Sequence, residues 1–305
     1  MSEHVSTPAA DPLALSWRRV FYWAVRRELW EYRSLVVAPI VVAAFGLFGG
    51  LMTTAWLPSV LTKVAAGSEP KSGLMGPYSF IAGATMMTSF FVAVFYTTNA
   101  LCSERRDRTL LFWKSLPVSD RTTVLAKATV PIFIAPAIAF AVILAFQLAL
   151  AAWSTFIAVA TGHDPALLWS RLRFDMMWLV LPYGLFVDAL WTAPAFAYLL
   201  AISAWARRVP FLWAAAPIVA PAMIEAMVST AGYKTIGFNA FIGRRLFGGL
   251  SEAFSIQGGG KAPVHAVSQV DPLRTFTSLD LWGGLVVAVL FLAAAIWLRR
   301  RRETL

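Results

Sequence analysis

Charged residues and cysteine are scarce in this chain of 305 residues. Only 14% of the residues are charged, whereas 59% are hydrophobic. A soluble domain carries about 25% charged residues, because its surface has to face water. The composition therefore excludes an ordinary soluble protein. The single cysteine, Cys102, also excludes an intramolecular disulfide.

Motifs for catalysis and for metal binding are missing as well. The three histidines (His4, His163 and His265) are far apart in the sequence, and with one cysteine they do not form the spacing of a metal site. The chain has no G-x-x-x-x-G-K-[ST] phosphate loop, since the Gly-Gly-Gly-Lys run at 258–261 lacks both the spacing and the final Ser or Thr. We therefore predict that the chain is not an enzyme and binds no cofactor itself.

Long apolar runs are what the sequence has in abundance. A helix needs about 20 predominantly apolar residues to cross the hydrocarbon layer of a membrane. Six runs reach this length, which predicts an all-α polytopic membrane protein with one transmembrane domain over residues 35–298. The expected spans lie at about 35–57, 78–102, 126–160, 176–205, 211–231 and 279–298.

The segment before the first span has a different pattern. Residues 1–12 are polar and predicted to be a disordered tail, whereas 13–34 form an amphipathic helix that is expected to lie in the membrane interface. The alternative is that 13–34 are the extended start of span one. The basic face carries Arg19, Arg26 and Arg33, and the apolar face carries Trp17, Phe21, Val25 and Tyr32. Glu28 does not fit this pattern, since it falls on the apolar face.

The basic residues predict the orientation of the chain in the membrane. If Lys127, at the start of span three, is counted with the loop before it, 17 of the 26 Lys and Arg residues lie on the side of the N-terminus. Cytoplasmic loops are enriched in Lys and Arg, so both termini are expected in the cytoplasm. The membrane is expected to be the inner membrane of the cell. Loop 103–125 and the basic tail 299–305 are then cytoplasmic, and loop 232–278 is external. Because the net charge of +10 follows this membrane orientation, it indicates membrane lipids as partners and not nucleic acid.

Loop 103–125 carries the most informative pattern. A charged stretch at 104–108 is followed by an apolar patch at 110–113 and by Leu-Pro-Val-Ser-Asp at 116–120, where Ser119 or Asp120 can cap the next helix. An exposed amphipathic helix with Leu, Phe and Trp needs a partner surface. The alternative is that these side chains lie flat on the membrane.

This segment resembles that of ABC-2 type transporter permeases: Glu, basic residues, Arg-Thr-Leu, a spacer, Leu-Pro-Val-Ser and Lys. The order of interfacial helix, six spans, charged loop after span two and larger external loop before span six is similar too. The resemblance implies the membrane subunit of a bacterial ABC exporter, whose loop at 104–121 is a coupling helix that docks on a separate ATPase subunit. The implied contact residues are Glu104, Arg105, Arg108, Thr109, Leu110, Phe112, Trp113, Leu116 and Pro117.

The resemblance also implies the partners and the energy source. Such permeases work as a pair, as a homodimer or with a related chain, together with ATPase subunits that bind ATP and Mg²⁺. The substrate is expected to be amphipathic or hydrophobic and to leave from the cytoplasm or the inner leaflet. The path is expected to form between the two permeases, lined by spans that include the second and the fifth.

Several polar residues inside the spans are candidates for this path. Asp188 and Glu225 are carboxylates in spans four and five, and such residues normally face protein or a water-filled cavity because their burial in lipid is costly. Thr85, Thr88 and Ser89 share one helical face of span two. Each of these residues has a purely structural alternative, as a buried hydrogen-bonded group.

The sequence leaves two other functions open. One is an ion-coupled secondary transporter or channel that uses Asp188 and Glu225, and the other is a membrane scaffold that transports nothing. In addition, Gly46 and Gly50 form a G-x-x-x-G pattern in span one, which predicts close helix packing either within the chain or between two copies.

Overall fold

The computed structural model describes residues 16–67, 72–106, 119–170, 172, 181–248 and 272–302. Within these ranges the chain is helical and contains no strand. Six helical stretches are long and apolar enough to cross a membrane, which confirms the predicted class of an all-α polytopic membrane protein. They are Ser34–Ala65, Leu74–Arg106, Asp120–Ala160, Leu181–Trp205, Pro210–Thr230 and Leu279–Arg301.

The described residues form thirteen α-helices and two short turns of other helix types. In chain order they are α1 (Trp17–Glu31), α2 (Ser34–Thr53), the 3₁₀ turn η1 (Thr54–Trp56), α3 (Leu57–Ala65), α4 (Ser72–Asn99), α5 (Cys102–Arg106), α7 (Asp120–Thr129), the π-helical turn η2 (Val130–Ile134), α8 (Ala135–Ala160), α9 (Pro165–Trp169), α10 (Leu181–Trp205), α11 (Pro210–Thr230), α12 (Phe238–Phe247), α14 (Pro272–Thr277) and α15 (Leu279–Arg302).

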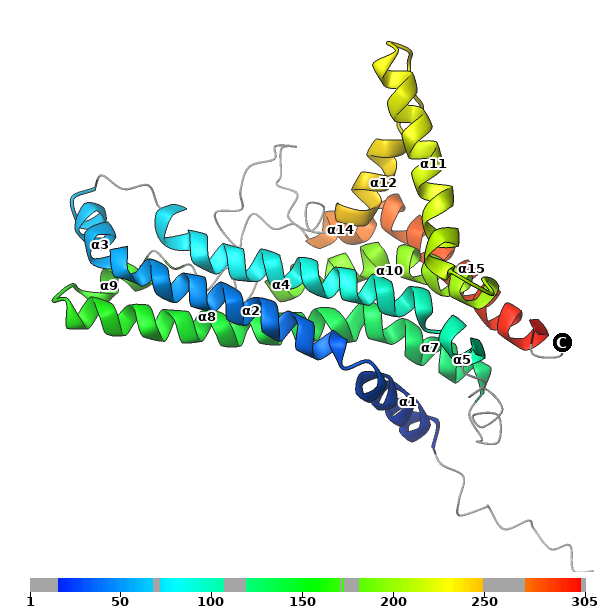
Figure 1. Ribbon diagram of the computed structural model, residues 1–305, viewed down its shortest axis with the longest axis horizontal. Helices are drawn as coiled ribbons and strands as arrows, with labels where there is room; N and C mark the ends of the chain where they lie inside the picture. Colours follow the sequence, from blue (N-terminus) through cyan, green and yellow to red (C-terminus); the bar gives the residue numbers. More distant parts are fainter. Residues whose placement is uncertain are drawn as a thin grey trace, which may run out of the picture.

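The long helices form an elongated bundle. Helices α2, α4 and α8 run side by side along its long axis, while α10 packs against α15 and α4 (Figure 1). Helix α10 is the central element, since 61% of its most apolar stretch is buried against 11% for α11. Helix α11 stands away from the bundle at a steep angle, with α12 alongside (Figure 1).

Helix α1 is separate from the first long apolar helix. It ends at Glu31, and the chain passes through Tyr32 and Arg33 before α2 begins at Ser34. The first spanning stretch continues beyond the expected end at 57, because η1 and α3 extend it to Ala65. The apolar side chains of α3 recur at helical spacing and are buried: Leu57, Leu61 and Val64.

The third spanning stretch changes its helix type near its first third. The π-helical turn η2 contains Pro131 and is followed by Pro136 at the start of α8. Proline has no N–H group, so each of these residues removes a hydrogen bond from the helical ladder. A local switch to π-helical pairing is a common accommodation of such a break.

The G-x-x-x-G pattern of α2 serves packing inside the chain. A Cβ atom added at Gly46 would lie 2.9 Å from Cγ1 of Ile81 on α4, and one added at Gly50 would lie 3.0 Å from Cδ2 of Leu150 on α8. Both glycines therefore let neighbouring helices approach α2 closely. Gly49, between them, has no atom within 4 Å of such a Cβ.

This contrast predicts different costs for the same substitution. Gly46→Val is expected to lower the free energy of unfolding by about 1–2 kcal/mol, because an overpacked contact displaces Ile81. Gly49→Val serves as the control, since its side chain enters open space. Unfolding in mixed micelles measures both, and equal losses would contradict the packing role of Gly46.

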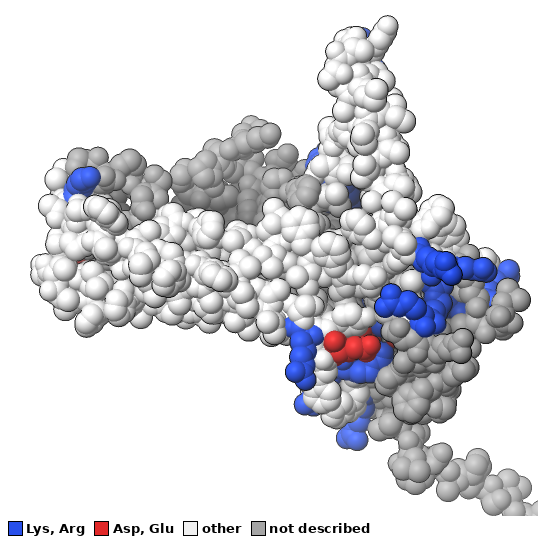
Figure 2. Space-filling view, viewed as in Figure 1, with Lys and Arg blue, Asp and Glu red and all other residues white. Residues whose placement is uncertain are grey.

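The charged residues are distributed unevenly along the bundle. Lys and Arg gather at the end where α1, α5, the α10–α11 connection and the C-terminal part of α15 lie (Figure 2). This is the end that the sequence predicts to face the cytoplasm. Acidic side chains are visible within the same region, which marks it as the place where opposite charges meet (Figure 2).

Candidate functional site

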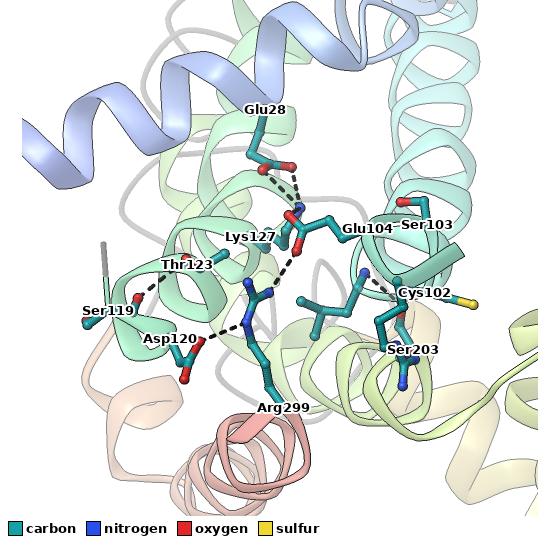
Figure 3. Close-up of polar contacts among 12 residues, drawn as sticks. Glu28, Cys102, Ser103, Glu104, Ser119, Asp120, Thr123, Lys127, Ser203 and Arg299 are labelled. Atoms are coloured by element: carbon teal, nitrogen blue, oxygen red, sulfur yellow. Dashed lines mark hydrogen bonds and ion pairs between the residues drawn. The ribbon is translucent and has the colours of Figure 1, made fainter. Parts of the chain in front are cut away.

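A buried cluster of charged side chains joins four helices at the basic end of the bundle (Figure 3). Lys127 on α7 is its centre, with Nζ 2.9 Å from both carboxylate oxygens of Glu28 on α1. The same Nζ lies 3.0 Å from Oε1 of Glu104 on α5. The side chains of Lys127, Glu28 and Glu104 are only 1%, 2% and 6% exposed, so these ion pairs are shielded from water.

Arg299 on α15 extends the cluster. Its Nη1 donates to Oε2 of Glu104 at 2.8 Å, and its Nε donates to Oδ1 of Asp120 at 3.1 Å. Glu104 precedes residues 107–118, which lie outside the described part of the chain, and Asp120 follows them. One arginine of the last helix therefore ties together both ends of this segment (Figure 3).

Arg27 and Tyr96 add further contacts to the two glutamates. Nη2 of Arg27 lies 3.0 Å from Oε1 of Glu28 and 3.1 Å from Oε1 of Glu104. The hydroxyl of Tyr96 on α4 donates to Oε2 of Glu28 at 2.9 Å. Buried charges are tolerated when they are paired and hydrogen-bonded, and these glutamates meet both conditions.

The described ion pairs of the cluster join carboxylates to cations. The carboxylates are Glu28, Glu104 and Asp120, and the cations are Arg27, Lys127 and Arg299. Arg27 also lies near Glu31 of α1. The described residues contain no group of His, Cys, Asp and Glu that could hold a metal ion. The ion pairs of the cluster hold α1, α5, α7 and α15 together.

Arg105 forms a second tie at the same end. Its guanidinium donates to the carbonyl oxygens of Ser203, Ala204 (2.6 Å) and Ala206 (2.9 Å) at the C-terminal end of α10. The last carbonyls of a helix have no partner within the helix, and a cation there also complements the helix dipole. The hydroxyl of Ser203 in turn accepts the N–H groups of Leu101 and Cys102 at 3.0 and 3.1 Å.

Local sequence accounts for the position of these side chains. The chain leaves α4 at Asn99 and re-enters a helix at Cys102, which turns Glu104 and Arg105 towards α7 and α10. On the far side of the segment, Ser119 is the N-cap of α7, where its Oγ accepts the N–H of Thr122 at 3.2 Å. The predicted cap at Ser119 is confirmed.

The predicted coupling residues fall into two groups. Glu104 and Arg105 bind helices of their own chain, so their side chains hold the start of the segment against α7, α15 and α10. Their expected contact with an ATPase subunit stays a prediction. The others lie outside the described residues: Arg108, Thr109, Leu110, Phe112, Trp113, Leu116 and Pro117.

The residues predicted for a path are brought together only in part. Ser89 and Asp188 line one small cavity of about 40 Å³ between α4, α8 and α10. The hydroxyl of Ser89 donates to the carbonyl of Ala135 at 3.2 Å. Thr85 is buried one turn earlier on α4, whereas Thr88 bonds within its own helix, to the carbonyl of Ala84.

Glu225 lies apart from these residues. Its Oε1 accepts the N–H groups of Gly237 and Phe238 at 2.6 and 2.9 Å, and its Oε2 accepts that of Asn239 at 2.5 Å. The first N–H groups of a helix have no partner within the helix, and a carboxylate there also complements the helix dipole. Glu225 on α11 therefore caps α12, which agrees with the structural alternative for this residue.

Sequence reasoning missed most of the ionic cluster. Asp120 was expected only as a helix cap, Arg299 was counted only for orientation, and Lys127 was used for orientation and as the last residue of the segment that resembles ABC-2 type permeases. One signal was available: Glu28 and Lys127 are charges on faces that are otherwise apolar, and such charges are costly unless a partner is near. The sequence could not predict that Glu28 pairs with Lys127, since the two residues are 99 positions apart.

Comparison with known proteins adds no identification. No protein-family model, no curated protein and no solved structure matches this chain. The fold and the apolar helices define the class as an all-α, multi-pass membrane protein.

Proposed function

We propose that this chain is the transmembrane permease subunit of an ATP-driven ABC exporter. It moves an amphipathic or hydrophobic substrate out of the cytoplasm or the inner leaflet. The observation that carries the proposal is the bracing of segment 107–118, because Arg299 binds both Glu104 before it and Asp120 after it. A segment that receives force from a partner needs such a rigid base.

The same contacts supply a route for that force. In this mechanism, a displacement of the segment passes to α1 through Glu28 and Lys127, and to α15 through Arg299. Arg105 passes it to the end of the central helix α10. Ion pairs shielded from water are stiff connections, because breaking one leaves an uncompensated buried charge.

The proposed partners are a separate ABC ATPase subunit, which binds ATP and Mg²⁺, and a second copy of the chain. Helix α11 supports the second copy, because only 11% of its most apolar stretch is buried within the chain. Large apolar side chains are exposed along it, and these suit a helix of another copy as well as lipid. They include Leu212, Met223, Ile224 and Met227.

Co-purification with the ATPase tests the proposal. The chain is expressed together with an ATPase whose coding region is adjacent, and the ATPase is expected to co-purify and to be lost from the double variant Trp113→Glu/Leu116→Glu. Ile236→Glu is the matched control, since Ile236 is an exposed apolar residue in the connection between α11 and α12. Isolation without any ATPase, or equal loss in the control, would overturn the proposal.

The second candidate is an ion-coupled secondary transporter or channel that uses Asp188 and Glu225, and the third is a scaffold. The cavity shared by Asp188 and Ser89 favours the second, because about 40 Å³ is enough space for water next to a carboxylate. The hydrogen bonds of Glu225 to three backbone N–H groups speak against it, since its oxygens are already engaged.

Substitutions at Glu225 separate a role in the path from a role as a helix cap. If Glu225 acts as a cap, the Glu225→Gln variant keeps an acceptor oxygen and is expected to transport almost normally. In that case Glu225→Ala exposes the N–H groups of 237–239 to faster hydrogen exchange. As an ion site, both variants lose flux in proteoliposomes. Normal protection of 237–239 in Glu225→Ala would contradict the cap.

A further inference from the structure

An open cavity of about 820 Å³ lies at the basic end of the bundle, next to the ionic cluster. Its walls come from the end of α1, from α4 and α5, and from the connection between α10 and α11. Among the described residues, four arginines line it, against one carboxylate, that of Glu31. They are Arg105, Arg106, Arg207 and Arg208.

The charge of the cavity favours an anion. Glu31 is also paired, since its Oε2 lies 3.6 Å from Nε of Arg27. Arg105 donates to the end of α10 but keeps its positive charge beside the cavity. A concave site lined by charges of one sign concentrates the opposite charge, and basic pockets between membrane helices are suited to anionic headgroups.

The backbone beside the two consecutive arginines is strained. Val209 has φ 48° and ψ 59°, and it is the only residue other than glycine with positive φ in the described part of the chain. A β-branched side chain makes this conformation unfavourable, and the following Pro210 restricts it further. Such strain persists where the surrounding structure requires it, frequently at binding sites.

The rim of the cavity continues into an apolar aromatic surface. Asn99 lines the cavity, and one turn earlier on α4 the exposed ring of Phe95 stacks on Phe211, with 5.7 Å between the ring centroids. Phe211 directly follows Pro210, which also lines the cavity. A polar, positively charged hollow therefore adjoins a surface suited to a hydrocarbon chain.

We infer that this cavity binds the phosphate headgroup of an anionic phospholipid from the adjoining leaflet, with an acyl chain over Phe95 and Phe211. Arg207 and Arg208 supply guanidinium donors, which match phosphate oxygens in pairs. An acidic protein segment would match the arginines but would leave the aromatic surface unused. The inference is independent of the proposed transport function, because it concerns the isolated chain and its membrane.

Lipid binding to the purified chain tests this inference. Native mass spectrometry of the chain titrated with phosphatidylglycerol or phosphatidylcholine gives the affinity for each lipid. Phosphatidylglycerol is expected to bind more tightly, and Arg207→Gln/Arg208→Gln to weaken it about 30-fold, since each arginine near a lipid headgroup contributes about fivefold. Arg18→Gln/Arg19→Gln, which removes two consecutive exposed arginines of α1, is the matched control.

Two further variants make the test specific. Arg207→Lys/Arg208→Lys keeps the charge but loses the paired guanidinium donors, so its affinity is expected to lie between those of the wild type and the Gln variant. Binding above that of the Gln variant would show that the loss in the Gln variant is not misfolding. Phe95→Asn is expected to weaken the phospholipid but not glycerol 3-phosphate, the soluble probe of the headgroup alone. Equal affinity for the two lipids, or equal losses in the Arg207/Arg208 and Arg18/Arg19 variants, would overturn the inference. Equal binding of glycerol 3-phosphate and phospholipid would overturn the acyl-chain contact.

Discussion

Replacement of Lys127 by alanine is expected to lower the free energy of unfolding by about 3–5 kcal/mol, because it leaves buried carboxylates without their central cation. Glu28 loses both of its 2.9 Å contacts to Nζ, and Glu104 loses one of 3.0 Å. Arg27 stays 3.0 Å from Glu28 and Arg299 stays 2.8 Å from Glu104, so each carboxylate keeps at least one cation and loses the buried ammonium group that joins them. Equilibrium unfolding in mixed micelles measures the change.

Two controls make this prediction specific to the buried charge. Arg300→Ala removes an exposed cation one residue from Arg299 and is expected to change the free energy of unfolding by less than about 0.5 kcal/mol. The double variant Lys127→Met/Glu28→Gln is expected to be more stable than Lys127→Ala, because an apolar or neutral replacement removes the unpaired charge as well. A loss in Lys127→Ala no larger than in Arg300→Ala would contradict the account.

Substitution of Arg105 is expected to have the second-largest effect, a loss of about 3 kcal/mol in Arg105→Ala. Three carbonyl oxygens at the end of α10 lose a charged donor, and no intrahelical N–H can replace it. Hydrogen exchange at 203–206 and unfolding in mixed micelles measure the local and the global change.

The conservative variant separates charge from geometry. Arg105→Lys keeps the positive charge near the helix end but cannot place donors on several carbonyls as a planar guanidinium does, so only a minor part of the stability is expected to return. Arg121→Ala, at an exposed arginine of α7, is the control. Full recovery in Arg105→Lys would show that the helix dipole alone explains the contact.

The sequence predicted the helices well because the signal is local. Each spanning stretch is a continuous apolar run, and backbone groups in a membrane must be paired within the helix. The ends were less accurate: α3 extends the first stretch to Ala65, where Leu57, Leu61 and Val64 find buried positions. That extension depends on neighbouring helices, which a local pattern does not describe.

Only a few residues of the candidate site were predicted from the sequence. Glu104 and Arg105 were singled out as contacts for a partner, whereas their pairing with α7 and α10 was not predicted. For Glu225 the sequence left a path role and a structural role open, and its carboxylate accepts the N–H groups of Phe238 and Asn239 at the start of α12. The pairing of a charge depends on distances across the fold, so composition and spacing could not decide between these roles.

The amino-acid sequence by itself determined the class of this protein. The scarcity of charge and the length of the apolar runs predict helices across a membrane, since a helix pairs its backbone groups within one continuous run. The tertiary structure alone decided which charges meet. Glu28, Glu104 and Lys127 come from three different helices. Each can be buried only with the others, because a buried charge is tolerated only when its partner is held at contact distance.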